Sequence, residues 1–189
     1  MAIVLYHGAA NGPSLAVLAA LAESGVAVER RPIDLLAGER HDLPGVDEPL
    51  ARDMGIEGEG PVLLVDGEAM TESVFLAQFF DELSDVSSLQ PADPFAHWEM
   101  MMWCRQITER LSPAAALLGN LAFSRGRLAA MADADFGAMA DRIVSADLRA
   151  RWEVLRDGAS IRHKWRTAAP RCRRRWNAAR ASWRMAANG

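Results

Sequence analysis

Cysteine is scarce in this chain of 189 residues, which contains only Cys104 and Cys172. Two cysteines that are far apart in the sequence give no disulfide framework, and this usage is typical of a reducing cytosol. No apolar run approaches the roughly 20 residues that a membrane-spanning helix requires. No basic stretch precedes the first apolar residues, because the first basic residue is Arg30. We therefore expect a cytoplasmic protein with no membrane partner.

Acidic residues are missing from the C-terminal part of the chain. Residues 159–189 contain nine Lys or Arg and no Asp or Glu, whereas residues 1–158 contain 12 basic and 25 acidic residues. The basic residues are interleaved with Trp165, Trp176 and Trp183, and no consistent apolar face emerges. Three interpretations are open: a nucleic-acid-binding tail, a solvated basic extension, or residues translated out of frame. The simultaneous loss of acidic residues and of periodicity favours the third, so we do not expect a nucleic-acid partner.

Metal-ligand clusters are also missing from the sequence. The four histidines are far apart, and neither cysteine has a partner at the spacing of metal ligands. We therefore expect no metal site.

What the sequence does contain is an apolar content of 50%, enough to bury the core of one large or two small domains. Its first part predicts a strand over 3–6, a helix over 14–24 that ends at Gly25, and a strand over 26–31. Strand, helix and strand in this order imply a right-handed crossover between parallel strands. An irregular segment follows over 35–58, then a hairpin over 62–70 and a helix over 73–83. This order is that of an α/β thioredoxin-like domain, which we place at 1–84.

The second part of the sequence predicts helices only. Residues 85–94 are rich in Asp, Ser and Pro, which is typical of a linker. Apolar residues then recur at helical spacing over 95–111, over 113–128 after Ser112 as cap, and from 135 to 158. The first of these helices is apolar on more than one side, which predicts that it is buried among others. We therefore expect an all-α, incomplete C-terminal domain at 95–158, followed by the tail at 159–189.

The stretch from Gly60 to Leu83 has the strongest chemical signal. Pro61 opens a short apolar strand, Asp66 and Gly67 supply a two-residue turn, and Glu72 and Ser73 stand where the return strand meets the next helix. The first N–H groups of a helix have no internal partner and attract a carboxylate. Ser73 adds a hydroxyl that can also cap the helix, and Glu72 adds a carboxylate for an ammonium group. The pair therefore suits the head group of an α-amino acid, although a plain helix cap and a solvated charge are the alternative.

This stretch resembles the glutathione site of the glutathione S-transferases. The resemblance implies a cis bond at Pro61, backbone contacts from Gly60 to the cysteine of glutathione, and a γ-glutamyl group held by Glu72 and Ser73. Glutathione would then be the cosubstrate. Members of the family usually have Val before the proline, so Gly60 keeps the backbone contacts but relaxes the turn.

Two hydroxyl groups are candidates for stabilising the thiolate of glutathione. Ser14, which begins the first predicted helix, lies in a run that resembles the corresponding turn of the bacterial classes, including the glutathione-dependent β-etherases. Tyr6, at the end of the first strand, resembles the tyrosine of other classes. We prefer Ser14 because it combines a hydroxyl with a helix N-terminus. Its alternative role is a plain N-cap, and that of Tyr6 is a partly buried strand aromatic.

The remaining candidates surround the predicted ligand. His41 lies where relatives bring a polar or basic side chain to the glycine carboxylate of glutathione, although a surface histidine is the common case. Met101, Trp103 and Cys104 could line a pocket for the second substrate, although Met and Trp at helical spacing are more often core residues. The resemblance thus implies a homodimeric transferase that acts on a hydrophobic, aromatic electrophile, with aryl-ether cleavage as the first reaction to test. The rival interpretation is a non-catalytic binding or regulatory module of the same fold.

Overall fold

The computed structural model describes residues 2–9, 11–46, 60–86, 88–143 and 145–157, together with residues 173, 174 and 177. The greater part of the basic tail lies outside the described residues, as does the segment 47–59. The three interpretations of the tail therefore stay predictions.

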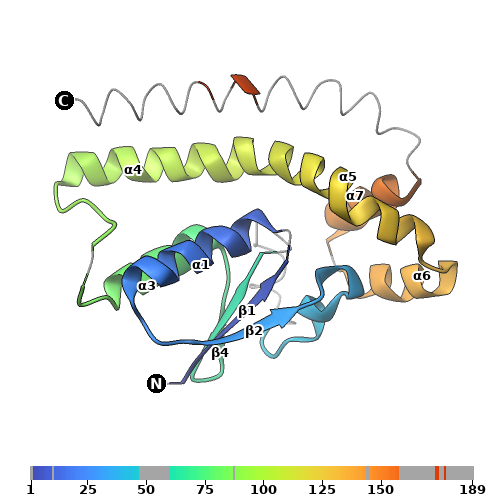
Figure 1. Cartoon of the computed structure of the whole chain (residues 1–189), viewed down its shortest axis with the longest axis horizontal. Coiled ribbons are helices and arrows are strands. Elements are labelled where there is room, and N and C mark those ends of the chain that lie inside the picture. The colour runs from blue at the N-terminus through green and yellow to red at the C-terminus, as the bar shows by residue number, and fades with distance from the viewer. Residues whose placement is uncertain are drawn as a thin grey trace.

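The first part of the chain forms a four-stranded sheet in the order β2-β1-β3-β4 (Figure 1). β1 pairs in parallel with β2, and the pairings of β1 with β3 and of β3 with β4 are antiparallel. Helices α1 and α3 pack against each other beside the sheet. This arrangement is the predicted thioredoxin-like domain, and its elements are β1 (Ile3–Gly8), α1 (Gly12–Ser24), β2 (Glu29–Ile33), β3 (Val62–Val65), β4 (Glu68–Met70) and α3 (Ser73–Glu82).

Apolar residues of alternating strand positions and of both helices form the core of this domain. Leu5 of β1 and Leu63 of β3 are fully buried and contact Val17, Leu76 and Phe80 from the two helices. In a strand, successive side chains point to opposite faces, so the neighbour of Leu5, Tyr6, lies on the other face of the sheet. The helices thus fix one face of the sheet as the interior.

The boundaries in this domain differ from the predicted ones at strands β1 and β2, at the start of α1 and, by one residue, at the end of α3. β1 continues to Gly8 and β2 runs over Glu29–Ile33, because their parallel ladder extends to the pair Gly8 and Ile33. α1 begins at Gly12 because Asn11 is its N-cap and accepts a hydrogen bond from the Ser14 N–H at 2.8 Å. The alternative role of Ser14 as a plain N-cap is therefore wrong. The described part of the irregular segment contains two short 3₁₀ turns, η1 (Leu35–Ala37) and η2 (Glu39–Asp42).

The second part of the chain is helical, as predicted, but its helices are divided differently. Figure 1 shows α4 and α5 running end to end, and a π-helical turn, η3, joins them without a break. The predicted break at Ser112 is therefore wrong. The widened turn precedes Pro113, whose ring would otherwise meet the carbonyl of the residue four positions earlier. The bounds are α4 (Pro94–Gln106), η3 (Ile107–Leu111), α5 (Ser112–Ala130), α6 (Asp133–Asp141) and α7 (Ala146–Asp157).

The predicted third helix of the second part is two helices, α6 and α7. Their apolar residues nevertheless form one buried cluster with Leu128 of α5, which includes Phe136, Ile143 and Trp152. The spacing of apolar residues thus identified the core correctly, although it missed the break between the helices.

Helix α4 contradicts the prediction that it is buried among other helices, because none of its residues is buried. Phe95 is 65% exposed, Trp98 55% and Met102 37%, and the three follow one another at helical spacing. They form an apolar stripe on α4. Among the described residues, no helix is both long and apolar enough to cross a lipid bilayer.

Candidate functional site

The strand directions bring the predicted ligand contacts to one end of the sheet. β1 and β2 are parallel and end there, β3 is antiparallel to β1 and begins there, and β4 ends there. The N-termini of α1 and α3 follow β1 and β4, so both lie at this end as well. Gly60 and Pro61, which precede β3, belong to the same place. In α/β sheets, ligands bind outside the ends of strands where helices begin.

Two cavities lie between this end of the sheet and the helices of the second part. The smaller, of about 380 Å³, is lined at one side by Gly12, Pro13, Ser73 and Val74 and at the other by α4 and η3. Two helix N-termini, those of α1 and α3, therefore face one cavity. Because a helix N-terminus carries a partial positive charge, this side of the cavity favours an anion, although at α1 Pro13 has no N–H and the Ser14 N–H is already bonded to Asn11.

The larger cavity measures about 1060 Å³ and extends from the loop after β2 to α5 and α7. Its walls combine apolar residues such as Leu36, Leu117 and Trp152 with the charged Asp34 and Arg127. Four residues line both cavities: Gly12, Pro13, Thr108 and Ser112. The N-terminus of α1 and the π-helical region therefore separate the two cavities.

Glu72 and Ser73 stand at the start of α3, as predicted, but Glu72 and not Ser73 occupies the N-cap position. Ser73 is the first helical residue and Glu72 is the N-cap residue, without a side-chain capping bond. The expectation that Ser73 caps α3 is therefore wrong. Ser73 is 5% exposed and lines the smaller cavity. Glu72 has φ of +71°, a conformation that side-chain-bearing residues rarely adopt.

Gly60 and Pro61 are buried at the start of β3. Among the described residues every peptide bond is trans, so the predicted cis bond between these two residues is wrong. The trans form is the intrinsically favoured one for a bond to proline. The Arg40 Nε donates a hydrogen bond to this carbonyl at 2.9 Å.

Ser14 and Tyr6, the two candidates for contacting the thiolate, line neither cavity. Ser14 is 1% exposed, and its hydroxyl accepts a hydrogen bond from the Gly8 N–H at 3.1 Å. It lies next to Pro13, which lines both cavities. The Tyr6 hydroxyl accepts a hydrogen bond from Arg31 at 3.1 Å on the side of the sheet away from α1 and α3. The structure therefore keeps only Ser14 close to the cavities.

His41 lies on η2 and lines neither cavity. Burial, together with the positive charges of Arg40 and Arg142, lowers the pKa of His41 to about 4 against the opposing effect of Asp42. The imidazole is therefore neutral at pH 7 and does not supply a positive charge for a carboxylate. The buried arginine beside it, Arg40, was not predicted from the sequence.

Of the three residues predicted to line a second-substrate pocket, Cys104 lines the smaller cavity and Met101 and Trp103 do not. Met101 instead accepts a hydrogen bond at its sulfur from Gln78. Burial raises the pKa of the Cys104 thiol, so the thiol is protonated at neutral pH. The other cavity-lining residues of this region were not predicted from the sequence, and they are Met100, Ile107, Thr108 and Ser112. The position of Pro113 is the one sequence signal for the widened turn that carries two of them.

Two curated proteins are similar to this chain in sequence. The protein LigF of Sphingobium sp. (strain NBRC 103272 / SYK-6) is 26% identical over 161 residues, which are 84% of this chain and 60% of LigF. A maleylacetoacetate isomerase of Rhizobium meliloti (strain 1021) is 38% identical over 91 residues, which are 48% of this chain and 40% of the isomerase. The chain therefore spans no more than about 60% of the length of these relatives. No protein-family model matches the sequence.

Two solved structures share the arrangement described above. The crystal structure of the beta-etherase LigF from Sphingobium sp. strain SYK-6 has a TM-score of 0.73 at 24% identity, over 91% of this chain and 69% of that one. The crystal structure of a glutathione transferase homologue from sulfitobacter, with bound glutathione, has a TM-score of 0.50 at 17% identity, over 92% of this chain and 91% of that one. The chain has the glutathione S-transferase fold. The resemblance predicted from the sequence is confirmed for the fold.

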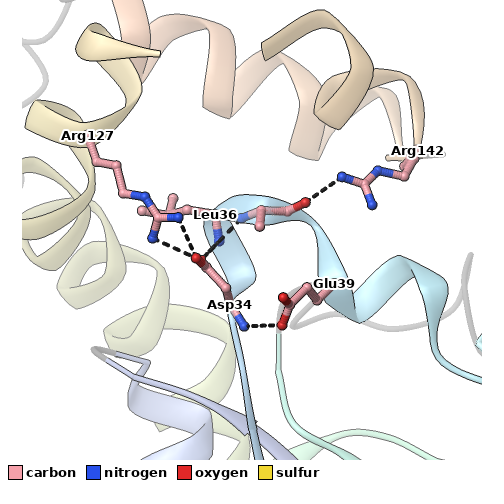
Figure 2. Close-up of polar contacts among 6 residues, drawn as sticks. Asp34, Leu36, Glu39, Arg127 and Arg142 are labelled. Atoms are coloured by element: carbon pink, nitrogen blue, oxygen red, sulfur yellow. Dashed lines mark hydrogen bonds and ion pairs between the residues drawn. The ribbon is translucent and has the colours of Figure 1, made fainter. Parts of the chain in front are cut away.

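Charged residues join the two parts of this glutathione S-transferase fold beside the larger cavity (Figure 2). Both terminal guanidinium nitrogens of Arg127 donate to the carboxylate of Asp34, which also accepts bonds from the Leu36 N–H at 3.0 Å and the Ala37 N–H. Arg142 donates to the Ala37 carbonyl and to the Asp42 carboxylate. These contacts hold η1 and η2 against α5 and the end of α6.

The Asp34 carboxylate makes this junction sensitive to acid. The hydrogen bonds from Arg127 lower the pKa of Asp34 in the folded chain, against the opposing effect of burial. A carboxyl group with a lowered folded pKa stabilises the fold above its unfolded pKa of about 3.9, and this contribution is lost as the pH falls through the folded pKa. Because both side chains are partly exposed to solvent, the pair contributes little more than a surface ion pair.

We predict that Asp34→Asn lowers the free energy of unfolding by about 0.5–1 kcal/mol at pH 7. The difference from the unmodified chain should shrink as the pH falls below the unfolded pKa of about 3.9 and through the lower folded pKa of Asp34, because the carboxyl group then becomes protonated and loses its charge. Urea unfolding at pH 7 and pH 3 measures it. Glu109→Gln is the control, since its partner Arg105 lies on the same helical run and joins no second element. An equal difference at both pH values would contradict the prediction.

Proposed function

We propose that the chain binds glutathione at this end of the sheet and transfers its thiolate to a hydrophobic, aromatic electrophile. The proposal depends most on one observation: Glu72, held at a positive φ, directly precedes a buried Ser73 that lines a cavity faced by two helix N-termini. A strained backbone of this kind persists only where the surrounding structure fixes it, and such residues cluster at functional sites. The fold shared with a glutathione-bound homologue supports the same assignment.

In this proposal, different residues bind different parts of glutathione. The N–H groups at the start of α3 and the Ser73 hydroxyl bind the carboxylate of the γ-glutamyl group, and Glu72 pairs with its ammonium group. Gly60 offers its backbone to the cysteine of glutathione. The thiolate lies at the N-terminus of α1, beside Gly12 and Pro13, where the helix dipole stabilises negative charge.

The larger cavity takes the electrophile in this proposal. The thiolate sulfur attacks a carbon that bears an aryloxy group, so a C–S bond forms as the C–O bond breaks, and the aryloxide leaves and takes a proton. The similarity to a protein described as a beta-etherase supports this reaction as the first to test. Binding of glutathione without turnover of any electrophile would instead assign the chain as a binding or regulatory module. A cytoplasmic location stays a prediction from the cysteine content.

Glu72→Gly separates the role of this side chain in binding from its cost to the fold. Glycine adopts a positive φ without steric strain, so the free energy of unfolding should change by no more than about 1 kcal/mol. Glutathione should bind at least about tenfold more weakly, because the partner of the ammonium group is lost. Isothermal titration and thermal unfolding measure the two effects. Glu68→Ala, in the exposed part of the same hairpin, is the control, and unchanged glutathione affinity in Glu72→Gly would count against the site.

Ser14→Ala and Tyr6→Phe distinguish the two candidate hydroxyl groups. The Ser14 hydroxyl accepts from Gly8 and keeps its own proton for a second acceptor, which it can reach if the first turn of α1 opens. Its loss should raise the pKa of the bound thiol by about one to two units, since a hydrogen bond to a charged group contributes about 1.5–3 kcal/mol. Tyr6→Phe should leave this pKa unchanged. The pH dependence of kcat/KM for an aryl halide, measured at saturating glutathione, reports the pKa of the bound thiol in both variants. The reverse pattern would identify Tyr6 as the contact.

We also propose that two copies of the chain associate through the apolar stripe on α4, formed by Phe95, Trp98 and Met102. Exposed apolar patches of this kind are typical of interaction sites, and self-association would cover the stripe. Trp98→Glu should therefore convert a dimer to a monomer in sedimentation experiments, whereas Glu99→Lys, next to it on the helix, should not. The proposal would be contradicted if the unmodified chain sedimented as a monomer at high micromolar concentration.

A further inference from the structure

Arg40 is a charged residue that the fold buries next to the proposed glutathione site. It lies on η2 and is 5% exposed, and its Nε donates to the carbonyl of Gly60, a residue 20 positions later in the chain. Burying a guanidinium group is unfavourable unless it is hydrogen-bonded. Arginine side chains are mostly exposed, so the burial of Arg40 indicates that its hydrogen bonds have a specific role.

The carbonyl that Arg40 contacts belongs to an unusual peptide unit. Because Pro61 has no N–H, the oxygen of Gly60 is the only hydrogen-bonding group of the peptide between these two residues. Gly60 has no side chain, so its backbone is less restricted than that of other residues that precede a proline. A hydrogen bond from Arg40 supplies a restriction from outside the strand.

The bond from Arg40 also leaves part of the carbonyl available. A carbonyl oxygen accepts two hydrogen bonds, and a donor that carries a charge makes a strong one. The Gly60 oxygen can thus accept from Arg40 and from the backbone N–H of an extended peptide at the same time. The neighbour of Arg40, Glu39, lines the larger cavity, so η2 connects the wall of that cavity to the start of β3.

We propose that Arg40 is a positioning residue for glutathione, which orients the Gly60 carbonyl so that it accepts the backbone N–H of the ligand's cysteine. The inference depends on the proposed function, because it assigns a role to Arg40 only if a peptide thiol binds beside Gly60. Arg40 touches neither the reacting sulfur nor the electrophile in this arrangement. Its effect is to hold the binding group in place before the ligand arrives, which lowers the entropy lost on binding.

Substitution of Arg40 by methionine and by lysine tests this role. Arg40→Met removes the donor and should raise the KM for glutathione and the Kd of the unreacted complex at least about tenfold. The kcat at saturating glutathione and the KM for an aryl halide should each change by less than about threefold, since Arg40 does not contact the reaction. Arg40→Lys keeps a charged donor of similar reach and should recover part of the glutathione affinity. Should the methionine variant fail to fold, the lysine variant carries the comparison.

Arg142, which contacts η1 and η2 from the end of α6, supplies a matched control. Arg142 anchors η1 and η2 to the end of α6 without contacting Gly60. Arg142→Met should therefore lower the melting temperature and leave the KM for glutathione unchanged. If Arg40 only ties the fold together, the Arg40 and Arg142 variants will both lose stability and keep the same KM for glutathione, which overturns the inference.

The failure of this inference is distinguishable from failure of the proposed function. A chain that binds no glutathione in isothermal titration overturns both. A chain whose binding is lost in Glu72→Gly but retained in full in Arg40→Met overturns the role of Arg40 alone. A loss in both variants, with affinity partly recovered in Arg40→Lys, supports both.

Discussion

Parallel pairing of β1 with β2 determines where a ligand can bind in this chain. The crossover through α1 makes the two strands run in the same direction, so both end at one side of the sheet. The antiparallel hairpin then places the start of β3 and the end of β4 at that side as well. Residues from distant parts of the sequence, such as Gly12, Gly60 and Ser73, are brought together by this constraint and by no local feature.

The sequence carried the local features of the site well. The short apolar run Val62–Val65, the Asp66–Gly67 turn and the helical spacing of apolar residues after Ser73 predicted the hairpin and its helix, because each depends on residues close together in the chain. The location of Ser73 at the start of α3 followed from the same pattern. Glu72 was placed correctly next to it, but its positive φ has no sequence signal, because the strain is imposed by the surrounding fold.

Long-range contacts account for what could not be predicted. The bond between Arg40 and Gly60 and the pair formed by Asp34 and Arg127 join residues from different elements, and nothing in the spacing of these residues indicates it. The sequence was also misleading for α4. Its Met and Trp residues predicted a buried helix, whereas the structure leaves an apolar stripe of that helix exposed, since the pattern records that a face is apolar and not what covers it. The cis bond expected before Pro61 was also wrong, because it was inferred from the resemblance and not from a contact within this chain.

Under the proposed function, the wall shared by the two cavities affects how a joined product leaves. It consists of Gly12 and Pro13 on one side and of Thr108 and Ser112 on the other, small or hydroxyl-bearing residues without a charge. Under the proposed function, a conjugate with one end in each cavity would therefore meet no charged side chain where the two cavities adjoin. Added bulk at these four positions would then act on the release of the conjugate more than on the binding of either half.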